Sequence, residues 1–245
     1  MKFSPKYVQV VLASILIVIS GSGMQSCIEK DPPTKITQVL LVPLSPNAGP
    51  VDFSINGSLY ATTVNYSTAV GTVRYTLPYF TVAPNAASTI AYNITGSTTA
   101  FASVMANLQE NKVYSTFLID SLSKIKAVVV NDDLADPKPG KVKIRFFHFS
   151  PNTPALDVIN SATGTKLYLN RSFNDQEANM VYENFMEIDP GAYIFIFKDV
   201  TTGAVVYTTP AQTLITDRIY TLAIRGFTGG TAAQSIGAWL YPNEP

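Results

Sequence analysis

Short runs of apolar and β-branched residues alternate with turn-forming residues along most of the chain. From residue 36 onward, runs rich in Val, Ile, Thr, Tyr and Phe are interrupted about every 8 to 12 residues by Gly, Pro, Asn or Asp. The clearest runs are 51–55, 72–80, 89–94, 113–120, 125–130, 193–198, 205–208 and 219–225. Asn56-Gly57 indicates a tight hairpin, because both residues tolerate positive φ. The pattern predicts an all-β protein.

The chain is similar to itself at a shift of about 105 residues. Ser45-Pro46-Asn47 precedes Asp52, and Ser150-Pro151-Asn152 precedes Asp157 at the same spacing. Further matched pairs are Pro84 with Pro190, Leu108 with Leu214, and 111–115 with 217–221. Several matches in the same order predict a duplicated domain.

We expect the two units to span 36–131 and 141–245, each an Ig-like or transthyretin-like antiparallel β-sandwich. Residues 132–140 between them are polar and rich in Asp, Pro and Gly, which predicts a solvated linker with few contacts across it. Its carboxylates suit Ca²⁺, but the linker interpretation is favoured. Segment 102–111 is expected to form strand and turn rather than helix, because the matching stretch contains Pro210.

Residues 1–26 have the layout of a secretory signal. Lys2 and Lys6 precede an apolar run from Val8 to Ile19. A helix of that length rises only about 18 Å, well short of the roughly 30 Å hydrocarbon core. The segment is therefore interpreted as a cleaved signal, and residues 27–35 as a short charged tether.

Cys27 is the only cysteine of the chain and stands where this signal ends. The arrangement resembles a bacterial lipoprotein signal, in which Cys27 would be lipidated and become the new N-terminus. The alternative is an ordinary signal peptide cleaved nearby, with Cys27 an incidental thiol. Glu29 and Asp31 resemble in part the surface-export signal of Bacteroidetes lipoproteins. We expect an outer-membrane lipoprotein that faces either the cell surface or the periplasm.

The opening of the second unit, 141–158, contains His148 followed by Ser150-Pro151-Asn152. Together with the later turn at 190–193, it resembles the bacterial family called domain of unknown function 4397. The first unit departs from the pattern at Pro43, which stands in the place of His148. The resemblance implies secreted or surface-anchored β-sandwich modules, often in lipoproteins, without an assigned activity.

Charge and composition exclude several classes of function. The 17 basic and 17 acidic residues balance, so the broad positive field of a nucleic-acid-binding protein is absent. One Cys and one His rule out an internal disulfide and a Cys/His zinc cluster. We therefore expect no nucleic-acid partner, no metal and no cofactor.

His148 is the only side chain whose ordinary pKa allows it to act as a general base near neutral pH. Catalysis would need it beside a nucleophile and a carboxylate, such as Ser150 and Asp157, but Pro151 ends the strand that would align them. We expect a hydrogen-bonded structural histidine. Asp52 and Asp157 are likewise expected to accept hydrogen bonds from backbone amides. No catalytic residue is predicted.

Tyrosines in loops are the best candidates for contact with a ligand, because their rings stack on sugars or peptides. The candidates are Tyr60, Tyr66 and Tyr168. The sequence thus predicts a non-enzymatic cell-envelope lipoprotein, held to the membrane by its lipid anchor, that presents two β-sandwiches for binding, adhesion or structural roles. The alternative is a glycan-binding accessory or subunit of a polysaccharide-processing system. The expected partner is a glycan or an envelope protein.

Overall fold

The computed structural model describes residues 35–66, 79–231 and 234–244. The signal segment, Cys27 and the tether up to residue 34 lie outside the described residues, as does most of the strand expected at 72–80. In the described part, no helix is long and apolar enough to cross a membrane.

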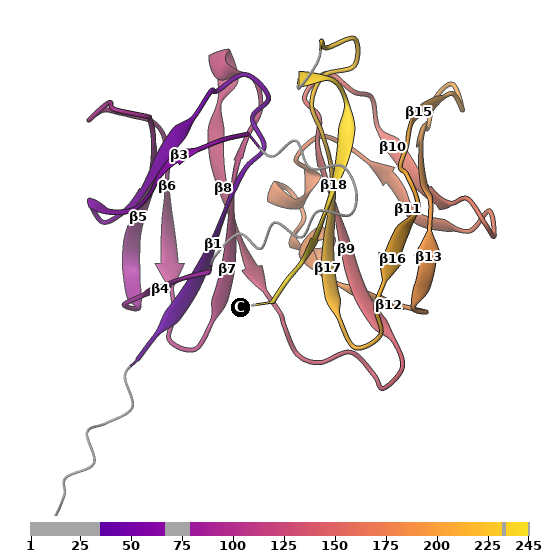
Figure 1. Cartoon of the computed structure of the whole chain (residues 1–245), viewed down its shortest axis with the longest axis horizontal. Coiled ribbons are helices and arrows are strands. Elements are labelled where there is room, and N and C mark those ends of the chain that lie inside the picture. Colours follow the sequence, from indigo (N-terminus) through magenta and orange to yellow (C-terminus); the bar gives the residue numbers. More distant parts are fainter. Residues whose placement is uncertain (1–34, 67–78, 232–233, 245) are drawn as a thin grey trace, which may run out of the picture. The chain divides into compact units, whose positions relative to one another are not determined.

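The first half of the described chain forms two four-stranded sheets (Figure 1). Its strands are β1 (Thr37–Pro43), β2 (Val51–Ile55), β3 (Ser58–Val64), β4 (Tyr79–Val82), β5 (Asn85–Ile94), β6 (Ala100–Leu108), β7 (Val113–Ile119) and β8 (Lys126–Asp132), with a 3-10 turn η1 (Leu122–Lys124). One sheet has the order β4-β1-β7-β8 and the other β3-β2-β5-β6. The predicted hairpin joins β2 to β3, with φ of 51° at Asn56 and 78° at Gly57.

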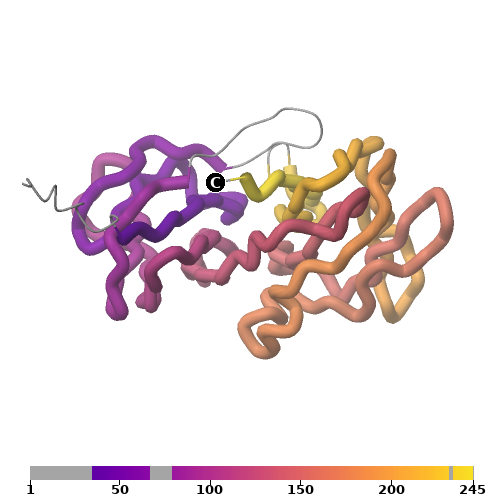
Figure 2. Tube along the Cα trace, turned by 90° about the horizontal axis from the view of Figure 1, so that it is seen from below, coloured from indigo at the N-terminus to yellow at the C-terminus, as the bar shows by residue number. Residues whose placement is uncertain are grey.

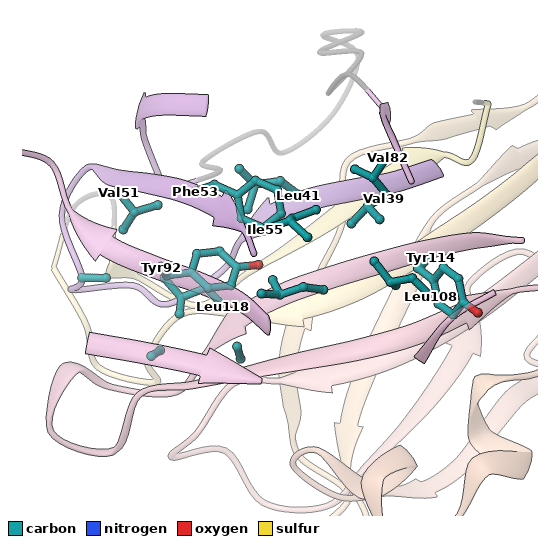
Figure 3. Packing of buried hydrophobic residues seen from close by; sticks show 14 residues of the cluster. Val39, Leu41, Val51, Phe53, Ile55, Val82, Tyr92, Leu108, Tyr114 and Leu118 are labelled. Atoms are coloured by element: carbon teal, nitrogen blue, oxygen red, sulfur yellow. The ribbon is translucent and has the colours of Figure 1, made fainter. Parts of the chain in front are cut away.

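Alternating side chains of these two sheets meet in a hydrophobic core (Figure 3). Phe53 on β2 and Tyr92 on β5 are fully buried there, with ring centres 5.4 Å apart. The Tyr92 hydroxyl forms a hydrogen bond of 2.7 Å with Thr116 Oγ1, which satisfies this polar group inside the core. The two sheets therefore form a β-sandwich.

The second half repeats this strand order. Its strands are β9 (Val142–Phe149), β10 (Leu156–Asn160), β11 (Lys166–Arg171), β12 (Met186–Ile188), β13 (Gly191–Tyr193), β14 (Phe195–Asp199), β15 (Val205–Thr208), β16 (Gln212–Leu214), β17 (Ile219–Arg225) and β18 (Gly237–Pro242), with 3-10 turns η2 (Asp175–Glu177) and η3 (Met180–Glu183). The sheets are β12-β9-β17-β18 and β11-β10-β14-β15, with β13 and β16 as a separate pair. A second core lies between the two larger sheets.

The all-β sandwich prediction is confirmed, and the strand expected in 102–111 is β6. Pairing is antiparallel except at two equivalent places, where β1 pairs with β7 and β9 with β17 in parallel. In both cases the chain crosses to the other sheet after the first strand. Because no hairpin joins the paired strands, β7 and β17 can run parallel to β1 and β9.

A third apolar layer joins the two sandwiches. It consists of the residues of β1, β7 and β8 that point away from the first core, packed against β9, β17 and β18. Phe117 of the first sandwich lies 5.5 Å from Phe147 and 5.1 Å from Phe149 of the second, between ring centres. Residues 133–141 connect β8 to β9 (Figure 2). The expectation that few contacts cross this boundary is wrong, because both inner sheets are apolar on both faces.

One buried ion pair crosses the same interface. The Arg145 guanidinium on β9 donates to the Asp132 carboxylate on β8, and both side chains are fully buried. Ser115 Oγ donates to the same carboxylate over 2.7 Å. The guanidinium carbon lies 4.8 Å and 4.4 Å from the ring centres of Phe147 and Phe185. Burial raises the pKa of Asp132, whereas Arg145 and Ser115 favour its ionised form.

Candidate functional site

The first Ser-Pro-Asn motif ties two turns of the first sandwich together. Ser45 Oγ donates to the backbone carbonyl of Asp120 over 2.6 Å, and Asn47 Oδ1 accepts from the backbone N–H of Leu122 at 2.8 Å. The motif lies after β1, and its partners lie between β7 and β8. Its role in this sandwich is structural.

The second motif makes the same connections. Ser150 Oγ donates to the Gly226 carbonyl over 2.7 Å, and Asn152 Oδ1 accepts from the Thr228 N–H at 2.9 Å. Asn152 Nδ2 also donates to the Thr228 carbonyl over 3.0 Å. Since Ser150 is fully buried and engaged in this turn, it is not oriented as a nucleophile.

His148 is fully buried and hydrogen-bonded, as expected from the sequence. Its Nε2 lies 3.1 Å from the carbonyl oxygen of Pro154, so this nitrogen carries the proton and donates. Its Nδ1 has no partner in the described part of the chain. Burial lowers the pKa of His148 to about 4, so the ring is neutral at physiological pH.

Asp52 holds an irregularity in the edge strand β3. Its carboxylate accepts from the backbone N–H of Thr63 at 2.9 Å, the Thr95 hydroxyl at 3.0 Å and the Gly96 N–H at 3.1 Å. These bonds, led by the one from Thr63, lower the pKa of Asp52. Thr63 has φ of 55°, which is rare for a β-branched residue.

Asp157 has the corresponding place in the second sandwich. It accepts from the Asn170 N–H at 2.9 Å, where Asn170 on edge strand β11 has φ of 47°. Lys166 Nζ lies 2.8 Å from its other oxygen, and this ammonium group is the main cause of the lowered pKa of Asp157. The amide partners of the two aspartates come from the neighbouring edge strand and, for Asp52, also from the turn after β5, rather than from the turn before each aspartate.

Two of the three candidate tyrosines lie on strands and point into the sandwiches. Tyr60 is on β3, with its ring centre 5.7 Å from that of Phe80. Tyr168 is on β11, where its hydroxyl donates to the Ile144 carbonyl over 2.8 Å and its ring packs 5.5 Å from Phe146. Neither is a loop residue, because the structure forms strands β3 and β11 where the sequence pattern indicated none.

Tyr66 lies just after β3 and contacts the other sandwich. Arg225 Nη1 donates to its hydroxyl over 2.6 Å, and the guanidinium carbon lies 4.7 Å from its ring centre. Burial raises the pKa of Tyr66, with Arg225 opposing this. The ring therefore helps to join the two sandwiches. The structure does not bring the three tyrosines together.

A groove of about 420 Å³ crosses the outer face of the β3-β2-β5-β6 sheet. Apart from Leu59, it is lined by small or hydrogen-bonding residues, among them Asp52, Ser54, Ala91 and Asn93. Ser54 and Asp52 alternate with the core residues of β2, and Ala91 on β5 leaves open space above the sheet. The alternation of polar and apolar residues in the sequence shows which side chains face outward. The position of the groove depends in addition on the pairing register of the strands.

Within the part of the chain that the structure describes, the lining of the groove contains one carboxylate, from Asp52, and no aromatic or histidine side chain. Among the described residues, no group of three His, Cys, Asp or Glu side chains could hold a metal ion. The groove offers hydroxyl, amide and carboxylate groups to a ligand.

These features define an all-β protein with joined sandwiches and a polar surface groove. A family model described as Domain of unknown function (DUF4397) matches residues 37–159, from β1 into β10. The chain belongs to this family. No curated protein matches the sequence.

Three solved structures show remote similarity. The Bacillus anthracis TIE protein matches at 9% identity and a TM-score of 0.24, over 85% of this chain and 43% of that protein, so the chain spans less than half of its length. A Bacteroides thetaiotaomicron VPI-5482 protein described as polysaccharide-binding (DUF1812) matches at 10% identity and a TM-score of 0.19, over 86% of this chain and 98% of that protein. A Bacteroides ovatus protein described as an adhesin matches at 11% identity and a TM-score of 0.18, over 89% of this chain and 97% of that protein.

Proposed function

We propose that this chain is a non-enzymatic binding protein of the cell envelope that recognises its partner through the groove on the β3-β2-β5-β6 sheet. The observation that carries the proposal is the polar lining of that groove. Ser54, Thr89 and Asn93 offer neutral hydrogen-bonding groups, and Asp52 is already fixed by three donors. Such an arrangement suits recognition of a polar ligand, since a carboxylate fixed by three donors is poorly placed to shuttle protons.

The anchor of the proposed protein is Cys27. Nine residues separate it from Thr37, the first residue of β1, and a stretch of that length reaches about 35 Å at most. A lipid at Cys27 would therefore keep the sandwiches close to an outer-membrane leaflet. Stable attachment needs two or more acyl chains, and a mature lipoprotein carries that number.

The second sandwich is proposed to be a second copy of the family domain. The same strand order, the same parallel pair and equivalent Ser-Pro-Asn and Asp contacts support this. The family match extends from the first sandwich into the first two strands of the second.

A glycan is the second candidate ligand, for an accessory role in a polysaccharide-processing system. The hydroxyl and amide groups of the groove suit sugar hydroxyls. Stacking of a sugar ring needs an aromatic face, and none lines the groove. The arrangement therefore favours a ligand held by hydrogen bonds and charge.

Two experiments test the proposal. Cys27→Ala should abolish labelling with a fatty acid and release the protein from membranes, and unchanged membrane retention would contradict the anchor. Protein and glycan arrays probed with the soluble fragment 28–245, which lacks the lipidated cysteine, should give binding that Ala91→Tyr removes by filling the groove. The matched control is Ile196→Tyr, at the equivalent register position of the second sandwich. Equal binding by both variants would refute the groove as the binding face.

A further inference from the structure

The strand registers of the two outer sheets identify equivalent positions with different chemistry. In the second sandwich, Lys166 pairs with Ile159, the residue two positions after Asp157. In the first sandwich, Leu59 pairs with the residue two positions after Asp52. Leu59 therefore has the register position of Lys166, so at this position the first sandwich carries an apolar side chain where the second carries a cation.

The two equivalent carboxylates differ accordingly in their partners. Asp157 Oδ2 lies 2.8 Å from Lys166 Nζ. Asp52 accepts three hydrogen bonds from neutral donors, and within the described residues no Lys or Arg pairs with it. A carboxylate has about four acceptor positions, so Asp52 retains capacity for one more donor. Among the described residues that line the groove, Asp52 is the only charged one.

We propose that the groove accepts the ammonium group of a lysine side chain from an extended segment of a partner protein, with Asp52 as its counter-ion. This inference rests on the proposed function of the groove as the binding face. The occupant would reproduce from outside the contact that Lys166 makes within the second sandwich.

The rest of the groove fits a lysine in a peptide better than an amino sugar. Leu59 is 62% exposed at the groove and offers an apolar surface for the methylene stem of a lysine. Ser54 and Asn93 provide partners for peptide N–H and C=O groups. An amino sugar would carry the same ammonium group but would lack an aromatic ring on which to stack.

A single ion pair at a solvated site binds weakly and is screened by salt, so the test needs a method that detects weak binding. The probes are Nα-acetyl-lysine-N-methylamide and its Nε-acetylated form, added to ¹⁵N-labelled 28–245. The reporters are the amides of Thr63 and Gly96, which donate to Asp52. We expect both signals to shift with the charged probe only, with affinity falling at least about threefold between 50 mM and 500 mM salt. Equal shifts with the acetylated probe would overturn the proposal.

Leu59→Lys provides the matched variant, because it places a lysine where the second sandwich has one. It should abolish binding of the charged probe, whereas Leu59→Gln should retain it. Both changes are at an exposed residue and leave the three hydrogen bonds of Asp52 in place. Undiminished binding by Leu59→Lys would refute the inference, as would binding of a glucosamine tetramer without the lysine probe. If Ala91→Tyr removes array binding while the lysine probe never binds, the groove function stands and this inference fails.

Discussion

Replacing Asp132 with Ala removes the partner of a buried guanidinium at the interface between the two sandwiches. Arg145 would keep its charge, because a guanidinium group is not deprotonated in proteins, and it would remain beside two aromatic rings without a counter-ion. Its Nη1 has no hydrogen-bond partner in the described chain even with Asp132 present. The Arg145 guanidinium is thus already buried with one nitrogen lacking a hydrogen bond among the described residues, and Asp132→Ala would remove its counter-ion as well.

The expected loss of unfolding free energy is about 3–5 kcal/mol, the cost of breaking a buried ion pair by removing one partner. Total stabilities of folded domains are about 5–15 kcal/mol, so this is a large fraction. With an m-value of about 3 kcal/mol/M in urea, the unfolding midpoint should fall by about 1–1.7 M. Arg145→Met should cost a similar amount, because it leaves Asp132 buried and unpaired.

Urea unfolding followed by far-UV circular dichroism measures these differences. The double variant Arg145→Met/Asp132→Leu removes both charges and should lie within about 1 kcal/mol of the parent or above it. Lys126→Ala is the control, since Lys126 and Glu177 form an ion pair that is exposed on both sides. Its loss should cost no more than about 1 kcal/mol. A cost below about 1 kcal/mol for Asp132→Ala, or a double variant as unstable as the singles, would refute this reasoning.

Three further predictions follow from the same contacts. The folded-state pKa of His148 is about 4, below its value in the unfolded chain. The unfolding free energy should therefore fall by about 3 kcal/mol as the pH drops from 6.5 to 4. In a plot of urea midpoint against pH, His148→Leu should flatten the decline over this range. Thr63→Asn should raise the unfolding free energy by about 1 kcal/mol, because Asn tolerates the left-handed backbone that Asn170 already adopts, and an unchanged midpoint would argue against strain. The fragment 141–245 exposes four aromatic residues of the shared layer, which removes about 6–12 kcal/mol of hydrophobic stabilisation. It should therefore bind ANS and show red-shifted Trp239 fluorescence. Blue-shifted Trp239 fluorescence together with cooperative urea unfolding would contradict this.

Local patterns predicted the strands and several turns, because period-two alternation and Asn-Gly chemistry act within a few residues. The repeated Ser-Pro-Asn motif indicated equivalent turns for the same reason. The shared layer was not predicted, although the run 39–44 is apolar at consecutive positions. Such a run shows that both faces of a strand are buried but does not identify what covers the second face. That depends on contacts between residues far apart in sequence.

The groove and the tyrosines show the same limit. Tyr60 and Tyr168 were placed in loops because β3 and β11 are polar edge strands with bulges, which weaken the alternation. Asp52 was recognised as important, but its partner Thr63 could be found only from the strand register. The contrast between Leu59 and Lys166 likewise exists only once the two registers are superposed.

The burial of both inner sheets on two faces divides the chain into strands under different selective pressure. A substitution in β1, β7, β9 or β17 must satisfy two packed layers at once, so these strands should change slowly among relatives. The sheets β3-β2-β5-β6 and β11-β10-β14-β15 each have one face that packs against no other layer of the described residues. New specificities, whether evolved or engineered, can therefore arise separately on these two faces without disturbing the joint between the sandwiches.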